Sequence, residues 1–333
     1  MVELKTVLVL GAGASWDFGF PMGGELVMQI LDNLSSKDKS EFKLFKEACA
    51  FLGEQNWTKT NDFPGVLKDA NPPSIDAWLA HNPTHIKRGK AAIAMALLQS
   101  EERADLRLKA KGDWYQLLFD RLNAPLEDFQ NNELSIISFN YDRSFEHRLF
   151  QSFTNTHTDG ETEKERAEKL KKCKSVLNQL NIVHVYGCLG RLDWQVENSE
   201  TPLKKVKYGA ELRADWLVAA AENIKILPEE SKTLSEEFQK ARTLIANADA
   251  LYFLGFGYDK TNMERLGIDA SVKPSKVMGT AYGLDYQRRR EVERLQIKDL
   301  SRHKGGLVPV SVYEFLHNYI DFNEGGLPDV AYK

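Results

Sequence analysis

The chain has 333 residues, of which 42% are hydrophobic and 28% charged, with a formal net charge of −4 and a pI near 6.0. This composition is typical of a globular protein, and the slightly acidic balance excludes a general attraction to nucleic acid or anionic membranes. No apolar run approaches the roughly 20 residues that span a bilayer. Cys49, Cys173 and Cys188 are too few and too scattered for a four-cysteine zinc site, and such sparse usage suits a reducing cytoplasm. We therefore expect a cytoplasmic protein that needs no metal, does not bind nucleic acid directly and does not associate with membranes.

The first predicted element is a buried parallel strand over Thr6 to Leu10, which contains only β-branched and aliphatic residues. Gly11-Ala12-Gly13-Ala14-Ser15 follows at once. Glycines in this position permit a tight turn and allow phosphates to approach the backbone N–H groups. The usual dinucleotide fingerprint has a third glycine where this chain has Trp16. The turn therefore either binds a nucleotide in another way or only connects a strand to a helix.

Residues 25–130 are predicted to be mostly helical, which is too long for a simple crossover between strands. We expect a helical layer or insertion beside the sheet, with Ser74 as the N-cap of one helix and a loop over residues 53–73. The predicted helices cover residues 25–52 with a break near Ser35-Ser36, residues 75–82, residues 86–109 and residues 113–122.

The rest of the chain alternates apolar strands with helical patterns, which predicts an α/β fold with a Rossmann-like parallel sheet flanked by helices. Further strands are predicted over 134–139, 181–186, 250–254 and 275–279, with weaker ones near 222–228 and 307–312. Further helices are predicted over 231–247, 285–297 and near the C-terminus, and residues 160–180 form either a charged helix or a mobile segment. Each main strand ends in a small or polar cluster: GAGAS, NYD, YGCLG, GFGYD and GT. Ligands bind at the carboxyl ends of parallel strands, so we expect these clusters to converge on one crevice.

Four of these stretches resemble sirtuin motifs in the sirtuin order. GAGAS followed by Gly19-Phe20-Pro21 is similar to the phosphate-binding loop, and Asn140-x-Asp142 is similar to the QN-x-D motif. Tyr186-Gly187-Cys188-Leu189 resembles the HGSL motif, and Gly255-x-Gly257 resembles the GTS turn. The resemblance covers about residues 6–282. It implies a SIR2-like NAD-binding domain over residues 1–305, including the helical insertion 25–130, and a C-terminal extension over 306–333.

Ser74-Ile75-Asp76-Ala77-Trp78-Leu79 and Trp114-Tyr115 look like features of the bacterial SIR2-like branch rather than of the deacylases. The chain departs from the deacylase pattern because it lacks the cysteine pairs of the zinc module and carries Met22-Gly23-Gly24 and Phe139 at motif positions. Tyr186 also replaces the motif histidine, and the nearest histidine, His184, lies two residues earlier. Residues i and i+2 of a strand share a face. His184 therefore either stands in for the missing histidine on the side of Tyr186 or is a buried core histidine.

The bacterial branch is associated with NAD⁺ hydrolysis in anti-phage defence. The resemblance thus implies an NAD⁺ glycohydrolase that releases nicotinamide and ADP-ribose, with NAD⁺ as the substrate. Asn140 would orient the attacking water, while Asp142 would act as a base or an electrostatic stabiliser, or would only cap the following helix. His184 or Tyr186 would bind the ribose hydroxyls, since a tyrosine with a pKa near 10 is a poor base at neutral pH.

The resemblance also implies a set of residues that contact NAD⁺. Asp259 would contact the adenosine ribose or cap the next helix. The implied contacts are Gly11, Ala12, Gly13, Ala14, Ser15, Pro21, Tyr141, Gly187, Gly255, Gly257, Tyr258 and Thr280.

Two other functions stay open. Tyr186 in place of the histidine also suits a non-catalytic sensor or scaffold that binds NAD⁺ or ADP-ribose. A zinc-free deacylase is a weaker alternative, because no acyl-peptide cleft is expected without the zinc module. We expect no second sensor domain after about residue 300, so control of a toxic enzyme would come from a homo-oligomer or a regulatory partner protein.

Overall fold

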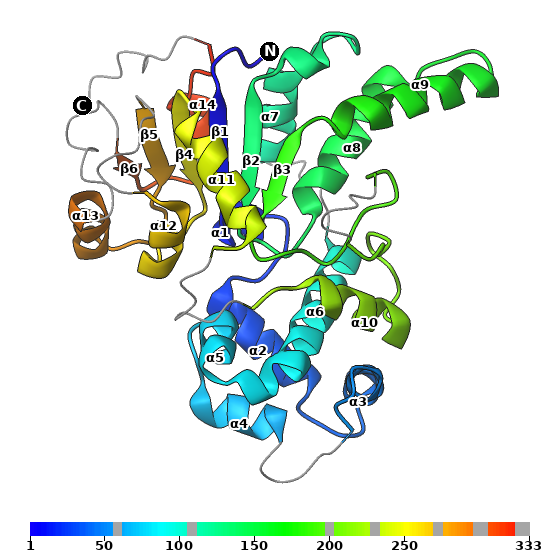
Figure 1. Ribbon diagram of the computed structural model, residues 1–333, viewed down its shortest axis with the longest axis vertical. Coiled ribbons are helices and arrows are strands. Elements are labelled where there is room, and N and C mark those ends of the chain that lie inside the picture. The colour runs from blue at the N-terminus through cyan, green and yellow to red at the C-terminus, as the bar shows by residue number, and fades with distance from the viewer. Residues whose placement is uncertain are drawn as a thin grey trace.

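The protein is built on a six-stranded parallel sheet with the strand order β3-β2-β1-β4-β5-β6 (Figure 1). The computed structural model describes residues 1–55, 62–104, 112–196, 203–226, 234–268, 276–295 and 306–323. The strands are β1 (Thr6–Leu10), β2 (Leu134–Ser138), β3 (Asn181–His184), β4 (Ala250–Leu254), β5 (Lys276–Thr280) and β6 (Leu307–Val308). The predicted α/β fold with a Rossmann-like parallel sheet is confirmed.

Helices cover both faces of the sheet, as the continuous apolar strands require. Leu8 and Leu10 of β1 belong to one core cluster, and Val7 and Val9 belong to the other. Alternate side chains of each strand thus pack on opposite faces. The first face is covered by α7 (Trp114–Leu122), α8 (Ser144–His157) and α14 (Val312–Asn318). The second is covered by α11 (Glu236–Ala246), α12 (Lys260–Leu266) and α13 (Tyr286–Leu295).

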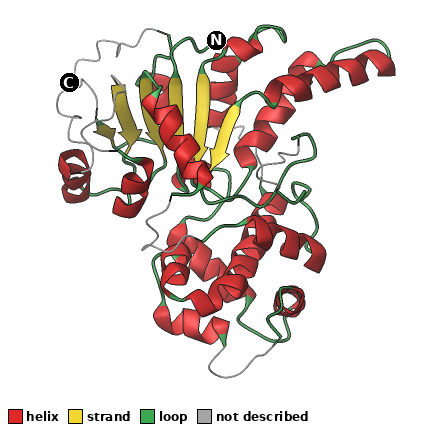
Figure 2. Cartoon of the chain, viewed as in Figure 1, coloured by secondary structure: helices red, strands yellow, loops and turns green. Residues whose placement is uncertain are grey.

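A group of helices that we call the helical lobe lies beyond the carboxyl ends of the strands (Figure 2). Its central helix is α6, which is buried at nearly every position from Arg88 to Glu101. Neighbouring helices surround α6 and leave it no solvent-exposed polar face. The lobe comprises α2 (Gly23–Asn33), α3 (Ser40–Phe51), α4 (Phe63–Ala70), α5 (Ile75–His81), α6 (Ile86–Arg103) and α10 (Ala214–Asn223).

Most predicted elements are present, but two predictions are wrong. The predicted loop over 53–73 contains α4, which begins with Phe63-Pro64 and ends at Asn71 in the left-handed conformation. Residues 56–61 of that loop lie outside the described residues. Of the possible strand near 222–228, residues 222–223 end α10, Ile224 forms an isolated antiparallel bridge with Gly187, and residues 227–228 lie outside the described residues.

The predicted insertion over 25–130 divides between two places. Helices α2 to α6 form the lobe, but α7 returns to the sheet and packs on α8, while α10 joins the lobe from a distant part of the chain. The charged segment 160–180 forms α9 (Glu163–Leu177), which packs on α8. Residues 307–318 add β6 and α14 to the same sheet and core, so this part of the sequence is integral to the α/β unit.

Candidate functional site

The strand register brings the predicted motifs to one edge of the sheet. Leu10 at the end of β1 pairs with Ser138 of β2 on one side and with Leu254 of β4 on the other. The segments that follow these three residues therefore start side by side. The strand order reverses between β1 and β4, which is where open α/β sheets form their ligand crevice.

A cavity of about 370 Å³, which we call the crevice, opens at this edge between the sheet and the helical lobe. Its volume lies within the range of small-molecule sites. Asp76 and Ala77 of α5 line it from the lobe, and Asn262 and Arg265 of α12 line it from the sheet side. Seven predicted site residues also line it, namely Gly11, Ala12, Asn140, Tyr141, Tyr186, Gly257 and Tyr258.

Other predicted site residues lie elsewhere. His184 and Gly187 line a second cavity of about 680 Å³ on the other side of the β3 turn, and Ala14 and Asp142 line a small pocket of about 10 Å³ next to Asn140. The remaining predicted residues are not among those that line these three cavities: Gly13, Ser15, Pro21, Gly255 and Thr280.

The glycine turn and the start of α1 (Gly13–Trp16) pack directly on the turn after β4. The Gly13 amide donates to the Gly255 carbonyl at 3.0 Å, and a Cβ on Gly255 would lie 2.1 Å from the Ala14 nitrogen. The amides of Gly11, Gly13, Ala14 and Ser15 all donate to backbone carbonyls. Among the described residues, only Ala12 of this turn has an amide without an acceptor, and Ala12 is exposed at the crevice. The glycines are thus required for contact between two turns, and Ala12 offers the available donor.

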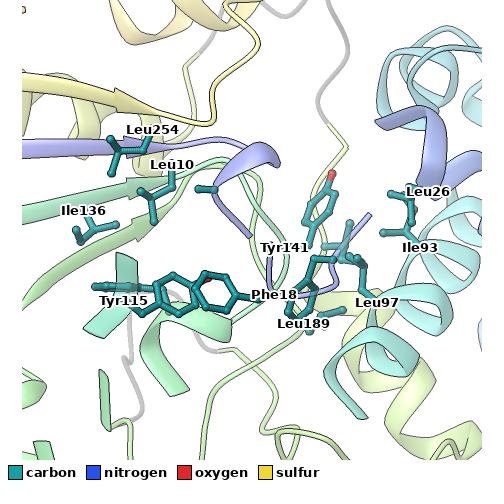
Figure 3. Packing of buried hydrophobic residues seen from close by; sticks show 14 of the residues in the cluster. Leu10, Phe18, Leu26, Ile93, Leu97, Tyr115, Ile136, Tyr141, Leu189 and Leu254 are labelled. Atoms are coloured by element: carbon teal, nitrogen blue, oxygen red, sulfur yellow. The ribbon is translucent and has the colours of Figure 1, made fainter. Parts of the chain in front are cut away.

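Two aromatic residues support the turn from the first face of the sheet. The Trp114 indole Nε1 donates to the Ala14 carbonyl at 2.7 Å, and Tyr115 stacks on Phe18 with 3.9 Å between ring centroids (Figure 3). Both tryptophan and tyrosine belong to α7. Their contacts give a structural role to the Trp114-Tyr115 pair of the sequence.

Asn140 is held with its amide group at the edge of the crevice. Its Nδ2 donates to the Gly11 carbonyl at 3.0 Å, and its backbone amide donates to Ser138 Oγ at 3.2 Å. Among the described residues, none donates to its Oδ1. This oxygen is therefore free to accept a hydrogen bond from a water or a hydroxyl in the crevice.

Asp142 is buried and connects two elements. Its Oδ2 accepts from Ser15 Oγ at 2.9 Å, and its Oδ1 accepts from the amide and the hydroxyl of Ser144, the first residue of α8. Burial raises the pKa of Asp142, and the bonds from Ser144 and Ser15 oppose that shift. These contacts hold the carboxylate against the first residue of α8, whose N-cap position is Arg143, and Asp142 is not among the residues that line the crevice.

Tyr186 and His184 line different cavities, which fits the alternative of a buried core histidine rather than a stand-in on the side of Tyr186. The strand ends at His184, and Tyr186 sits in the following turn, where strand alternation no longer applies. The Tyr186 hydroxyl donates to Asn262 Oδ1 at 2.5 Å and accepts from Arg265 Nη1 at 2.6 Å. Burial raises the pKa of Tyr186, and Arg265 opposes that shift. Tyr186 is therefore a neutral link between the β3 turn and α12.

The helical lobe contributes one acidic side chain that the sequence did not single out as a site residue. Asp76 Oδ1 accepts from the Tyr141 hydroxyl at 2.5 Å, and Tyr141 lies between the strand ends and the lobe helices that carry Leu26 and Ile93 (Figure 3). Burial raises the pKa of Asp76, and the bond from Tyr141 opposes that shift. The Ser74–Leu79 stretch was the sequence signal that could have identified Asp76. The Ser74 side chain caps α5 and so fixes Asp76 in the first turn of that helix.

The far side of the crevice is fixed by contacts around β5. Thr280 Oγ1 accepts from the Gly255 amide at 2.8 Å, and the Thr280 carbonyl accepts from the Tyr258 hydroxyl at 3.0 Å. Asp259 accepts from the Asn262 amide at 3.0 Å and so caps α12. Thr280 thus shapes the turn after β4. The contacts of Asp259 are those of a helix cap, the second of the two roles expected for it.

No group of three histidine, cysteine or acidic side chains in the described part of the chain is arranged to hold a metal ion. The three cysteines are free and buried. Within the same residues, no helix combines the length and apolar character needed to cross a membrane. No protein-family model matches the sequence, and no curated protein matches it. The fold and the crevice therefore define the class of this protein as a Rossmann-like α/β protein with a cavity at its topological switch point.

Proposed function

We propose that the protein is an NAD⁺ glycohydrolase that cleaves NAD⁺ into nicotinamide and ADP-ribose. The observation that carries this proposal is Asn140, which lines a 370 Å³ crevice at the β1–β4 switch point beside the glycine turn and whose carboxamide oxygen accepts from none of the described residues. Dinucleotides bind across this position in doubly wound sheets. The order of the sirtuin-like motifs supports the choice of NAD⁺ among them.

The proposed reaction needs little acid–base assistance. The bond between nicotinamide and C1′ breaks, nicotinamide leaves as a neutral molecule with the bonding electrons, and the ribose takes up positive charge. Water then adds to C1′ and gives its proton to solvent. Asn140 would hold this water through its Oδ1, while the exposed Ala12 amide would contact the diphosphate. Asp142 would act indirectly, because its two oxygens are already occupied by Ser15 and Ser144.

Depletion of NAD⁺ would suit an effector of bacterial anti-phage defence, as the resemblance implies. Such an enzyme must be silent until it is needed, so we propose control by self-assembly or by a regulatory partner protein. Light scattering after size exclusion, combined with an activity assay on each fraction, tests this point. We expect activity in an oligomer or after addition of a partner, and an isolated monomer that is fully active would contradict it.

A binding protein without turnover is the second candidate. It is favoured by Tyr186, which takes the place of the motif histidine and is bonded to Asn262 and Arg265 at the crevice. Such a protein would retain NAD⁺ or ADP-ribose without releasing nicotinamide.

The test is to incubate the full chain with NAD⁺ and to quantify free nicotinamide by chromatography, alongside calorimetric titration with NAD⁺. Asn140→Ala is the informative variant. Asn247→Ala is its matched control, because that amide only bonds the Thr243 carbonyl near the end of α11. We expect release by the wild type and by Asn247→Ala, and a loss of at least ~100-fold in Asn140→Ala. Binding of NAD⁺ without release of nicotinamide would favour the sensor. The absence of both binding and release would refute both candidates.

A further inference from the structure

His184 lies between two hydrogen-bond acceptors, the Asn140 carbonyl and the buried Glu146, rather than at the crevice. Its Nδ1 is 2.8 Å from the Asn140 carbonyl oxygen, and its Nε2 is 2.5 Å from Glu146 Oε1 of α8. The side chains of His184 and Glu146 are only 11% and 4% exposed. Neither lines the crevice.

The chemistry of these contacts fixes the state of the ring. A carbonyl oxygen only accepts, so Nδ1 must carry a proton, and a carboxylate also only accepts, so Nε2 must carry one as well. Burial alone would lower the pKa of His184, but the charge and the hydrogen bond of Glu146, together with the Asn140 carbonyl, raise it. The two side chains thus form a buried, hydrogen-bonded ion pair.

This pair holds the residue that faces the crevice. Three polar groups of Asn140 have protein partners: the carbonyl accepts from His184, the backbone amide donates to Ser138, and Nδ2 donates to the Gly11 carbonyl. The fourth group, Oδ1, is directed by the other three. Catalytic groups need their geometry fixed by such supporting contacts.

We propose that Glu146 and His184 are a positioning pair that fixes the Asn140 backbone, and that His184 does not touch the substrate. The effect of this pair on kcat rests on the proposed function, whereas its effect on the Asn140 backbone does not. Glu146 lies in the first turn of α8, just after the Asn140-x-Asp142 motif, and Asp142 accepts from the Ser144 amide at the start of that helix. The same short segment therefore supplies both the crevice amide and the acid that anchors it.

The informative variant is Glu146→Gln, which keeps the shape of the side chain and removes its charge. Its matched control is Glu54→Gln. Glu54 pairs with the buried Arg88 at 2.9 Å in the helical lobe, and neither residue of this pair lines the crevice. With NAD⁺, we expect Glu146→Gln to lower kcat about 10- to 100-fold while changing the Kd for NAD⁺ less than about 3-fold. Glu54→Gln should change neither value by more than about 3-fold.

A second readout does not depend on activity. Amide hydrogen exchange across residues 138–142, measured without NAD⁺, should become faster in Glu146→Gln and stay unchanged in Glu54→Gln. Should Glu146→Gln fail to fold, His184→Gln is expected to show the same pattern. Unchanged exchange, an unchanged kcat in an active enzyme, or an equal loss of affinity and kcat would each overturn the positioning role. If the wild type releases no nicotinamide, the proposed function fails, and the exchange measurement still decides the pairing.

Discussion

Gly255 and Gly257 follow the same strand but have different structural constraints. Gly255 has φ +57° and would bring a Cβ within 2.1 Å of the Ala14 backbone nitrogen, whereas a Cβ on Gly257 meets nothing within 4 Å. We predict that Gly255→Ala lowers the free energy of unfolding by about 3 kcal/mol or more, because it adds backbone strain and a steric overlap. Gly257→Ala should change it by less than about 1 kcal/mol. Urea denaturation measures both, and equal effects would contradict the contact between the two turns.

The sequence could predict that some residues at the strand ends, such as Asn140, reach the crevice, but not what supports them. Asn140 directly follows an apolar strand, so its place at the carboxyl edge follows from the parallel sheet. Glu146 and Asp76 were missed because their partners, His184 and Tyr141, lie 38 and 65 residues away in the sequence. Such long-range contacts leave no local periodicity.

At the scale of elements, a buried ion pair joins the helical lobe to the sheet. The Arg143 guanidinium forms two bonds with Glu101 of α6, and its Nη1 donates to the Gly190 and Val206 carbonyls at 3.1 and 2.6 Å. The side chains of Arg143 and Glu101 are 1% and 0% exposed. These four hydrogen bonds of Arg143 therefore fix the loop between β2 and α8 against the lobe.

We predict that Glu101→Gln lowers the free energy of unfolding by about 3–5 kcal/mol, because it leaves the Arg143 charge buried without a charged partner. The control is Asp215→Asn, which breaks the exposed pair with Arg213 and should cost less than about 1 kcal/mol. Chemical denaturation of both variants measures these two losses of unfolding free energy. A loss below 1 kcal/mol in Glu101→Gln would show that the pair does not tie the lobe to the sheet.

The elements themselves were largely predictable, and the failures have physical causes. Short apolar runs bounded by polar clusters identified β1, β2 and β4 because both faces of these strands are buried. The end of β3 was placed two residues too late, since the apolar pattern continues into the turn that carries Tyr186. The first residues of the possible strand near 222–228 instead end α10, which packs against α6 and α3, a contact that no local pattern encodes.

At the scale of the whole molecule, stability should depend on pH through His147. This ring stacks on Tyr208 with 3.8 Å between centroids, and burial together with Arg143 lowers its pKa to about 4, against the opposing charge of Glu146. A histidine in the unfolded chain has a pKa near 6.5. The unfolded state thus binds the proton first as the pH falls. The stabilising contribution is complete above about pH 6.5 and is lost progressively toward pH 4.

We predict that the wild type loses about 3 kcal/mol of unfolding free energy relative to His147→Phe between pH 7 and pH 4. Phenylalanine keeps the stack on Tyr208 and cannot be protonated. The contributions of the other titrating groups therefore cancel in the difference between the two unfolding free energies. Urea titrations at pH 7, 5.5 and 4 measure it. A difference that stays constant with pH would show that His147 does not remain neutral in the folded protein.

Under the proposed function, NAD⁺ is cleaved in the 370 Å³ crevice and not in the larger cavity beside β3. Ala77 is an exposed residue of α5 that lines the crevice, and Val196 is a 71% exposed residue that lines the larger cavity. Nicotinamide release by Ala77→Phe and Val196→Phe, with thermal unfolding as a check of folding, distinguishes the two cavities. We predict that Ala77→Phe loses at least ~100-fold of the wild-type rate because the ring fills the crevice, while Val196→Phe keeps it. Full activity in Ala77→Phe, or loss confined to Val196→Phe, would show that NAD⁺ is not cleaved in the crevice.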